Sequence, residues 1–196
     1  MNFLEPILLI HVLTQLGLTQ NYIQDQYAIL SGYVVSLLVT PTFFCTIIYR
    51  LYLPIATDDL YYHKSTAFLH LLYALLICLL IGLPFTLIFY FFPKQSLMVL
   101  YNTTSGYQQL KYMAFPFLLF YLQTPLSTIL QAKNKNKVMF IISIIECTLE
   151  IILTYTLSHY LYVNAILISL FTGLITTLTL SAIYCFKIII KDTSLS

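Results

Sequence analysis

The sequence predicts an all-α integral membrane protein, a bundle of six transmembrane helices, and three observations lead to this fold class. Of its 196 residues 60% are hydrophobic and only 8% are charged, whereas soluble domains carry about 25% charged residues. The mean hydropathy is +0.88. Residues 66–92 and 151–186 contain no Asp, Glu, Lys or Arg, and each run exceeds the roughly 20 helical residues that cross a bilayer core. A soluble enzyme, a nucleic-acid-binding module and a secreted disulfide scaffold are thereby excluded.

Three helices are expected in the first half of the chain. The first covers residues 3–18 and ends at the polar segment TQNYIQDQ. The second, residues 27–49, lies between that segment and Arg50. The third is the uncharged run at 66–92, which follows a more polar connection that ends at Ser65. Each is an apolar stretch bounded by polar residues, which is the hydropathy pattern of a membrane span.

The second half of the chain contains three further expected helices. Residues 108–131 follow a polar region from Lys94 to Tyr107 and end at the basic segment KNKNK. Residues 138–158 come next and end at SHYLYVN, and residues 163–187 complete the set. All six helices are expected to form one membrane domain that covers residues 1–196.

The distribution of basic residues predicts the orientation of this domain. If the N-terminus is cytoplasmic, seven of the nine Lys and Arg residues fall on the cytoplasmic side, and only Lys94 and Lys111 fall outside. Because cytoplasmic connections are enriched in Lys and Arg, we expect a multi-pass protein of the bacterial cell membrane with both termini in the cytoplasm. The cytoplasmic set is Arg50, Lys64, Lys133, Lys135, Lys137, Lys187 and Lys191.

The cysteine and charge patterns indicate neither a metal site nor a nucleic-acid partner. The four cysteines lie far apart in apolar runs, at Cys45, Cys78, Cys147 and Cys185. They form no Cys/His cluster at metal-ligand spacing. The net charge is +2, without the basic stripe that tracks a phosphate backbone. No cofactor is expected.

Three carboxylates fall inside expected spans and are candidates for a transport cavity. Glu146 and Glu150 lie four residues apart on one helix face, and Glu5 lies beside Pro6 in the first span. A carboxylate at the bilayer centre costs about 2.5–3.5 kcal/mol, so such residues usually face protein or water and mark functional sites. We therefore expect these side chains to line a water-filled cavity and to hold protons or a cation.

Two further stripes repeat at a spacing of four residues. Gln123, Ser127 and Gln131 form a polar face on the fourth span, which either lines the same cavity or makes interhelical hydrogen bonds. Ser169, Gly173 and Thr177 on the sixth span form a face of small residues. That second face predicts close packing against a neighbouring helix.

Several segments resemble one family of membrane transporters. The stretch PFLLFYLQTPLSTILQAKNKNK, from Pro116 to Lys137, is similar to a helix and basic loop of the stage V sporulation protein B branch of the multidrug/oligosaccharidyl-lipid/polysaccharide exporter superfamily. FLEPILLIHVL, beginning at Phe3, resembles the start of that family's seventh helix. Leu53-Pro54-Ile55-Ala56 resembles the segment after its eighth helix. Residues 66–187 resemble the C-terminal domain of polysaccharide biosynthesis proteins.

The resemblance implies a fold of two six-helix lobes and the alternating-access transport of lipid-linked sugars. The matching segments correspond to the seventh to twelfth helices, so the chain is expected to be the C-terminal lobe and to need a companion chain for the other lobe. The resemblance also implies that the substrate is a lipid-linked oligosaccharide or a cell-wall or spore-cortex precursor. Arg50, Lys133, Lys135 and Lys137 would then contact phosphate at the cytoplasmic surface. Ser127 and Thr128 depart from the Gln-Ala that the branch commonly has there.

Other functions remain open alternatives. A substrate-binding membrane subunit of a small-molecule importer has a similar size and helix number, although its binding loops would be richer in Trp and Asn. An intramembrane enzyme would need adjacent catalytic carboxylates, which the spacing of Glu146 and Glu150 does not supply. A fragment that inserts into the membrane without transporting anything is a further alternative.

Overall fold

Every regular element in the described part of the chain is a helix. The computed structural model describes residues 4–62 and 66–193, with side chains from Ile7 to Ile190 except Leu8. The α-helices are α1 (Leu4–Gln15), α2 (Gln20–Ala28), α3 (Ser36–Val39), α4 (Thr42–Tyr61), α5 (Ala67–Phe91), α6 (Pro93–Tyr101), α7 (Tyr107–Ala132), α8 (Asn136–Leu161) and α9 (Ala165–Thr193). A π-helix, Ile29–Val35, precedes α3, and a 3₁₀ turn, Tyr162–Asn164, joins α8 to α9.

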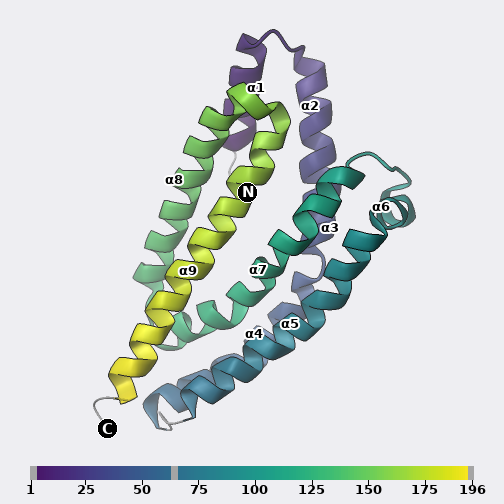
Figure 1. The fold of residues 1–196 in the computed structure, drawn as a ribbon. Helices are drawn as coiled ribbons and strands as arrows, with labels where there is room; N and C mark the ends of the chain where they lie inside the picture. Colours follow the sequence, from purple (N-terminus) through teal and green to yellow (C-terminus); the bar gives the residue numbers. More distant parts are fainter. Residues whose placement is uncertain (1–3, 63–65, 194–196) are drawn as a thin grey trace.

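Three stretches of the described residues are long and apolar enough to cross a membrane: Ala67–Phe91, Tyr107–Ala132 and Asn136–Ile190. Gln20–Val39 and Thr42–Tyr61 pass the same test as a pair bent by 42°, which gives up to four candidate spans. The third stretch contains both α8 and α9, which run antiparallel from the 3₁₀ turn (Figure 1). The all-helical membrane fold is therefore confirmed, but six spans are not.

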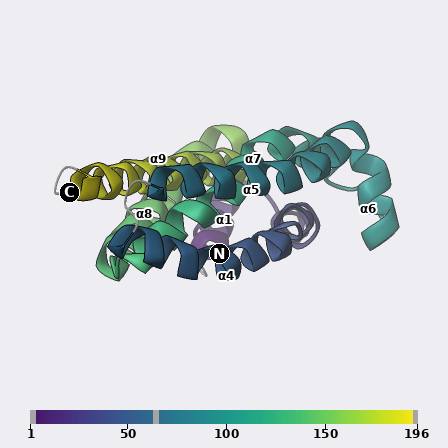
Figure 2. The same cartoon turned by 90° about the horizontal axis from the view of Figure 1, so that it is seen from below.

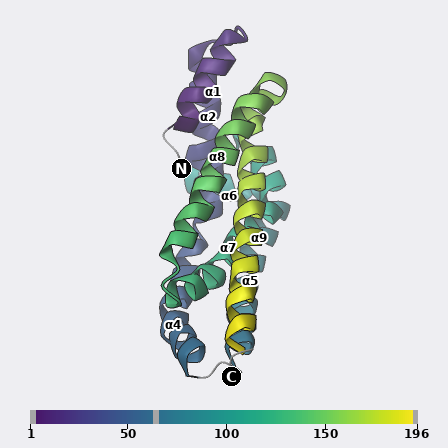
Figure 3. The same cartoon turned by 90° about the vertical axis from the view of Figure 1, so that its left-hand side faces the viewer.

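The expected first span, residues 3–18, does not appear as one spanning helix. α1 ends at Gln15, and a helix of its 12 residues rises about 18 Å, well short of a hydrocarbon core of about 30 Å. Gly17 follows with a φ of 85°, a left-handed conformation that glycine adopts without strain. The chain then turns back into α2, so α1 and α2 form a short hairpin (Figures 1 and 3).

Helical structure extends beyond the expected second span, residues 27–49, at both ends. Helical structure begins earlier, at Gln20, and α4 continues to Tyr61. The stretch after Arg50, which hydropathy assigns to a connection, is therefore helical as far as Tyr61. The helix continues through this stretch because Tyr52, Ala56 and Leu60 bury one apolar face in a hydrophobic cluster.

The bend within this second segment has a local cause at Pro41. Proline has no N–H to donate to the preceding turn, and the Thr40 N–H instead donates to the Leu37 carbonyl at 3.2 Å. The hydroxyl of Tyr121, on α7, donates to the Leu38 carbonyl at 2.7 Å. A kink at proline is thus stabilised by a hydrogen bond from a neighbouring helix.

The region from Lys94 to Tyr107, expected as a polar connection, contains the nine-residue helix α6. Pro93 occupies its first turn, where a missing N–H costs nothing. Asn102 at its end has a φ of 52° and Gly106 has a φ of 88°. These two left-handed residues reverse the chain into α7. The other expected ranges, 66–92, 108–131, 138–158 and 163–187, overlap α5, α7, α8 and α9.

The long helices lie in two layers, with α5, α7 and α9 in one and α1, α4 and α8 in the other (Figure 2). Two apolar clusters hold them together. One is centred on Tyr121, Leu110 and Phe117 of α7, and the other on Ile129 and Leu130 nearer the end of that helix. α7 packs against α4, α5 and α9, so it is the central helix of the bundle.

Candidate functional site

The two candidate carboxylates of α8 face α9 across a regular antiparallel contact. Thr154 donates a hydrogen bond to the Ser169 hydroxyl at 2.8 Å. One turn away, Glu150 packs on Gly173, and one turn further Glu146 lies beside Thr177. Each step of four residues along α8 is thus matched by a step of four in the opposite direction along α9. The predicted small-residue face, Ser169, Gly173 and Thr177, is the surface on which the carboxylates rest.

Gly173 is the residue that makes room for Glu150. A Cβ atom at this position would lie 2.7 Å from Oε1 of Glu150 and 3.1 Å from its Cγ. Contacts between non-bonded heavy atoms are normally 3.5–4.0 Å, about 1 Å longer than the shorter of these. The close approach of α8 and α9 at this level therefore depends on the absence of a side chain, as in other membrane helix pairs.

Thr177 leaves hydrogen-bonding capacity beside Glu146. Its hydroxyl is near enough to interact with the Glu146 carboxyl. It is nevertheless a buried oxygen that makes no hydrogen bond of standard geometry with the described residues. Glu146 itself is half-buried. This level of the interface could therefore take up a proton, a small cation or water between the carboxyl and the hydroxyl.

The other candidate cavity residues are distributed differently. The side chain of Glu5 lies outside the described residues. Gln123 and Ser127 are half-buried on α7, and the Ser127 hydroxyl donates to the Thr124 carbonyl of its own helix at 2.8 Å. Gln131 accepts a hydrogen bond from the Tyr49 hydroxyl of α4. The polar face of α7 is thus partly used for contacts within and between helices.

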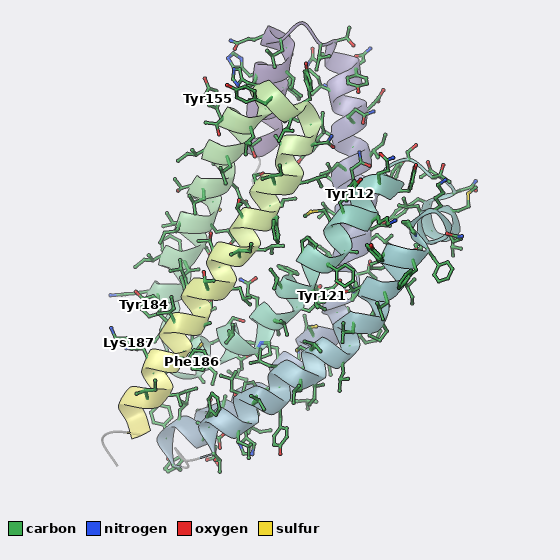
Figure 4. The ribbon with its side chains drawn as sticks, in the orientation of Figure 1. Tyr112, Tyr121, Tyr155, Tyr184, Phe186 and Lys187 are labelled. Carbon is green, nitrogen blue, oxygen red and sulfur yellow. The ribbon has the colours of Figure 1, made fainter. Side chains whose placement is uncertain are left out.

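Three of the candidate phosphate-binding residues, Lys133, Lys135 and Lys137, lie at the turn between α7 and α8, whereas Arg50 lies near the middle of α4. Arg50, Lys135 and Lys137 are exposed. Lys133 is half-buried, and its Nζ lies 3.4 Å from the Leu60 carbonyl and 4.6 Å from the centre of the Tyr61 ring. Lys133 therefore attaches the turn between α7 and α8 to the end of α4. Lys187 projects from α9 near the same end (Figure 4).

A buried polar cluster near this end was not identified from the sequence. The carboxylate of Asp59, whose side chain is only 5% exposed, accepts hydrogen bonds from Nδ1 of His70 at 2.7 Å and from the Thr66 hydroxyl at 2.9 Å. The cluster joins the end of α4 to the start of α5. Asp59 lies in the stretch that hydropathy assigns to a connection, so the sequence did not predict that its side chain is buried.

The described residues contain no group of three or more His, Cys, Asp or Glu side chains that could hold a metal ion. Cys45 of α4 and Cys78 of α5 are buried and in contact with each other, and both are free thiols. The chemistry that this part of the chain offers is therefore that of carboxylates and hydroxyls at a helix interface, together with exposed cations at one end.

Comparison with known proteins identifies a relative for part of the chain. No protein-family model matches it, and no solved structure matches it. Stage V sporulation protein B of Bacillus subtilis (strain 168) is 30% identical over 133 residues, which are 67% of this chain and 26% of the relative. The chain thus spans about a quarter of the length of the relative it matches. Over that part of its length, the chain is stage V sporulation protein B-like, as its motifs predict.

Proposed function

We propose that this chain is one lobe of a flippase-type transporter that moves a lipid-linked oligosaccharide, or a cell-wall or spore-cortex precursor, across the bacterial cell membrane by alternating access. The observation that carries the proposal is the similarity to Stage V sporulation protein B over 133 residues. The long apolar helices are consistent with it, because such helices occur where the chain must cross lipid.

A second lobe, on the same or another polypeptide, would complete the transporter. The substrate of this family of transporters passes between two lobes, and one lobe supplies only one wall of that path. In this proposal the chain is the C-terminal lobe, residues 66–187 belong to its polysaccharide biosynthesis domain, and both termini are cytoplasmic. Lys133, Lys135, Lys137 and Lys187 would then lie on the cytoplasmic side, as the positive-inside rule requires.

The carboxylates of α8 are proposed to couple transport to protons or a cation. Two acidic side chains one helical turn apart repel each other when both are ionised, so this pair favours binding of a proton or a cation. The Thr177 hydroxyl, which lies close enough to Glu146 to interact with its carboxyl, supports this role. Glu5 and Gln123 are proposed to line the same path. Ser127 and Gln131, which are engaged in other hydrogen bonds, would contribute less.

The exposed cations are proposed to contact the diphosphate of the substrate. Arg50, Lys135 and Lys137 remain exposed and can approach a phosphate at the membrane surface. Lys133 instead donates a hydrogen bond to the Leu60 carbonyl. We therefore expect Lys135 and Lys137 to contribute more to substrate binding than Lys133.

Photo-cross-linking tests the proposed substrate class. The chain is placed in lipid nanodiscs with a polyprenyl-diphosphate glycan that carries a diazirine next to the diphosphate. Adducts should concentrate on the turn between α7 and α8 and fall at least threefold when Lys135 and Lys137 are both changed to Gln. The matched control changes Lys94 and Lys111 to Gln, which removes the same charge elsewhere. Equal labelling by a polyprenyl alcohol without phosphate would contradict the proposal.

A further inference from the structure

A cavity that none of the assignments above uses lies between α7 and α9. Its volume is about 470 Å³, within the range of about 300–1,000 Å³ that small-molecule sites occupy. α7 contributes Gln108, Gln109 and Tyr112 near its start, and the 3₁₀ turn after α8 contributes Asn164. Figure 1 shows the two helices diverging at this end of the bundle, and Figure 4 places Tyr112 near the start of α7.

The cavity combines hydrogen-bonding groups with an apolar surface. Gln109, Tyr112 and Asn164 make no side-chain hydrogen bond within the part of the chain that the structure describes. Gln108 makes only a 3.3 Å contact with the Tyr107 hydroxyl. The remaining lining is apolar and includes an aromatic ring, with Met113, Pro116, Leu161, Leu167, Ile168 and Phe171. No charged side chain lines the cavity.

These groups fit one class of ligand better than others. Amides and a phenol both donate and accept hydrogen bonds, as the hydroxyl groups of a sugar require. The flatter C–H face of a sugar ring is apolar and can lie on an aromatic or aliphatic surface. A phosphate would find no cation here. An acyl chain that filled the cavity would separate the amides from water without replacing their hydrogen bonds, which is unfavourable.

We propose that this cavity binds a neutral oligosaccharide, with the amides of Gln109 and Asn164 on its hydroxyls and Tyr112 against a ring face. The inference rests on the proposed function, because it assigns the cavity to the glycan of the transported lipid. The α7 residues that line the cavity end at Pro116, and the helix rises about 24 Å from there to Ala132, which separates this cavity from the basic turn at the other end of the helix. Because the diphosphate is bonded directly to the first sugar, the two sites act at different steps: the cavity holds the glycan after the diphosphate has left the basic turn.

The absence of tryptophan from the chain allows a direct test. Tyr112 is largely exposed at the edge of the cavity, and Tyr112→Trp introduces a single reporter there while keeping an aromatic surface. The probe is N,N′-diacetylchitobiose, a soluble disaccharide without lipid or phosphate, added to the full chain in nanodiscs. We expect a saturable change in tryptophan fluorescence. Gln109→Leu combined with Asn164→Leu should weaken the apparent affinity about tenfold or more, as expected for two lost hydrogen bonds. Gln24→Leu, an exposed control on α2, should leave it unchanged.

Saturation-transfer NMR on the wild-type chain gives a readout that does not depend on substitutions. Signal transfer to the sugar protons, lost in the Gln109 and Asn164 double variant, supports the proposal. The highest sugar concentration is 50 mM, about tenfold above a weak millimolar Kd. The absence of both signal transfer and a fluorescence change up to this concentration would overturn the proposal. So would a fluorescence response to decanol in place of the sugar. Because the probe has no lipid or phosphate, failure here leaves the cross-linking test of the proposed function unaffected.

Discussion

Gly82 on α5 offers a sharp test of the packing of this bundle, because it lies directly against Tyr121. A Cβ atom at position 82 would be 2.5 Å from Cδ2 of Tyr121 and 3.0 Å from Cδ1 of Leu118. Tyr121 is 1% exposed, and its hydroxyl is fixed on the Leu38 carbonyl at 2.7 Å. The ring therefore cannot move away from a new methyl group without loosening the hydrogen bond at the Pro41 bend.

Three effects decide the size of the change for Gly82→Ala. Adding a methyl group to a packed core costs about 1–3 kcal/mol, and weakening one buried hydrogen bond costs about 0.5–1.5 kcal/mol. Alanine is favoured over glycine in a helix by about 1 kcal/mol. We expect a net loss of about 2 kcal/mol in the free energy of unfolding, measured by far-UV circular dichroism during SDS titration in mixed micelles.

Gly32→Ala is the matched control, because no heavy atom lies within 4 Å of the position of its Cβ. This variant should be unchanged or slightly more stable. In a Tyr121→Leu background the flat ring is gone, so Gly82→Ala should cost less than about 0.5 kcal/mol, a non-additivity expected of residues in contact. The packing argument is refuted if Gly82→Ala is as harmless as Gly32→Ala.

Two further predictions concern the hydrogen bonds of Asp59 at the end of α4 and the side of the membrane on which the turns lie. Asp59→Ala removes the buried acceptor shared by the part-buried His70 and Thr66 side chains and should lower the free energy of unfolding by about 1 kcal/mol. The exposed Asp25→Ala should change it by less than about 0.5 kcal/mol, and equal effects of the two substitutions would contradict a stabilising role for the Asp59 hydrogen bonds. The second prediction concerns orientation and uses a variant without native cysteines, in which Tyr160 or Asn134, both exposed, is replaced by cysteine. A cysteine at position 160 should react with an impermeant maleimide added outside the cell, and one at position 134 should not. Labelling of the cysteine at position 134 from outside would contradict the proposed orientation.

The sequence was sufficient to predict the long helices, because their apolar runs are uninterrupted. Residues 66–92 contain no charge, and α5 occupies Ala67–Phe91. The same rule failed at α4, since helical hydrogen bonds continue to Tyr61 after the apolar run ends. It also could not detect the bend before α4, where a hydroxyl 83 residues away, on Tyr121, takes part in the local hydrogen bonding.

The candidate site was predictable in its residue types but not in its contacts. A spacing of four placed Glu146 and Glu150 on one face, and the same spacing placed Gly173 and Thr177 on another. Nothing in the sequence specified that these two faces meet, because the register of an antiparallel helix pair is set by the turn between the helices and by side-chain packing. The same limit applies to Asp59, whose partners Thr66 and His70 lie at the start of α5.

The most direct test of the central claim is translocation of a lipid-linked glycan. The chain, purified together with the lobe that accompanies it in its native membrane, is reconstituted into liposomes with a polyprenyl-diphosphate glycan bearing a fluorophore that external dithionite reduces. We predict that the fluorophore on the inner leaflet becomes accessible faster than in protein-free liposomes, and that Glu150→Gln slows this exchange at least tenfold without changing the folded fraction. An exchange rate equal to that of protein-free liposomes would contradict the assignment as a flippase-type transporter.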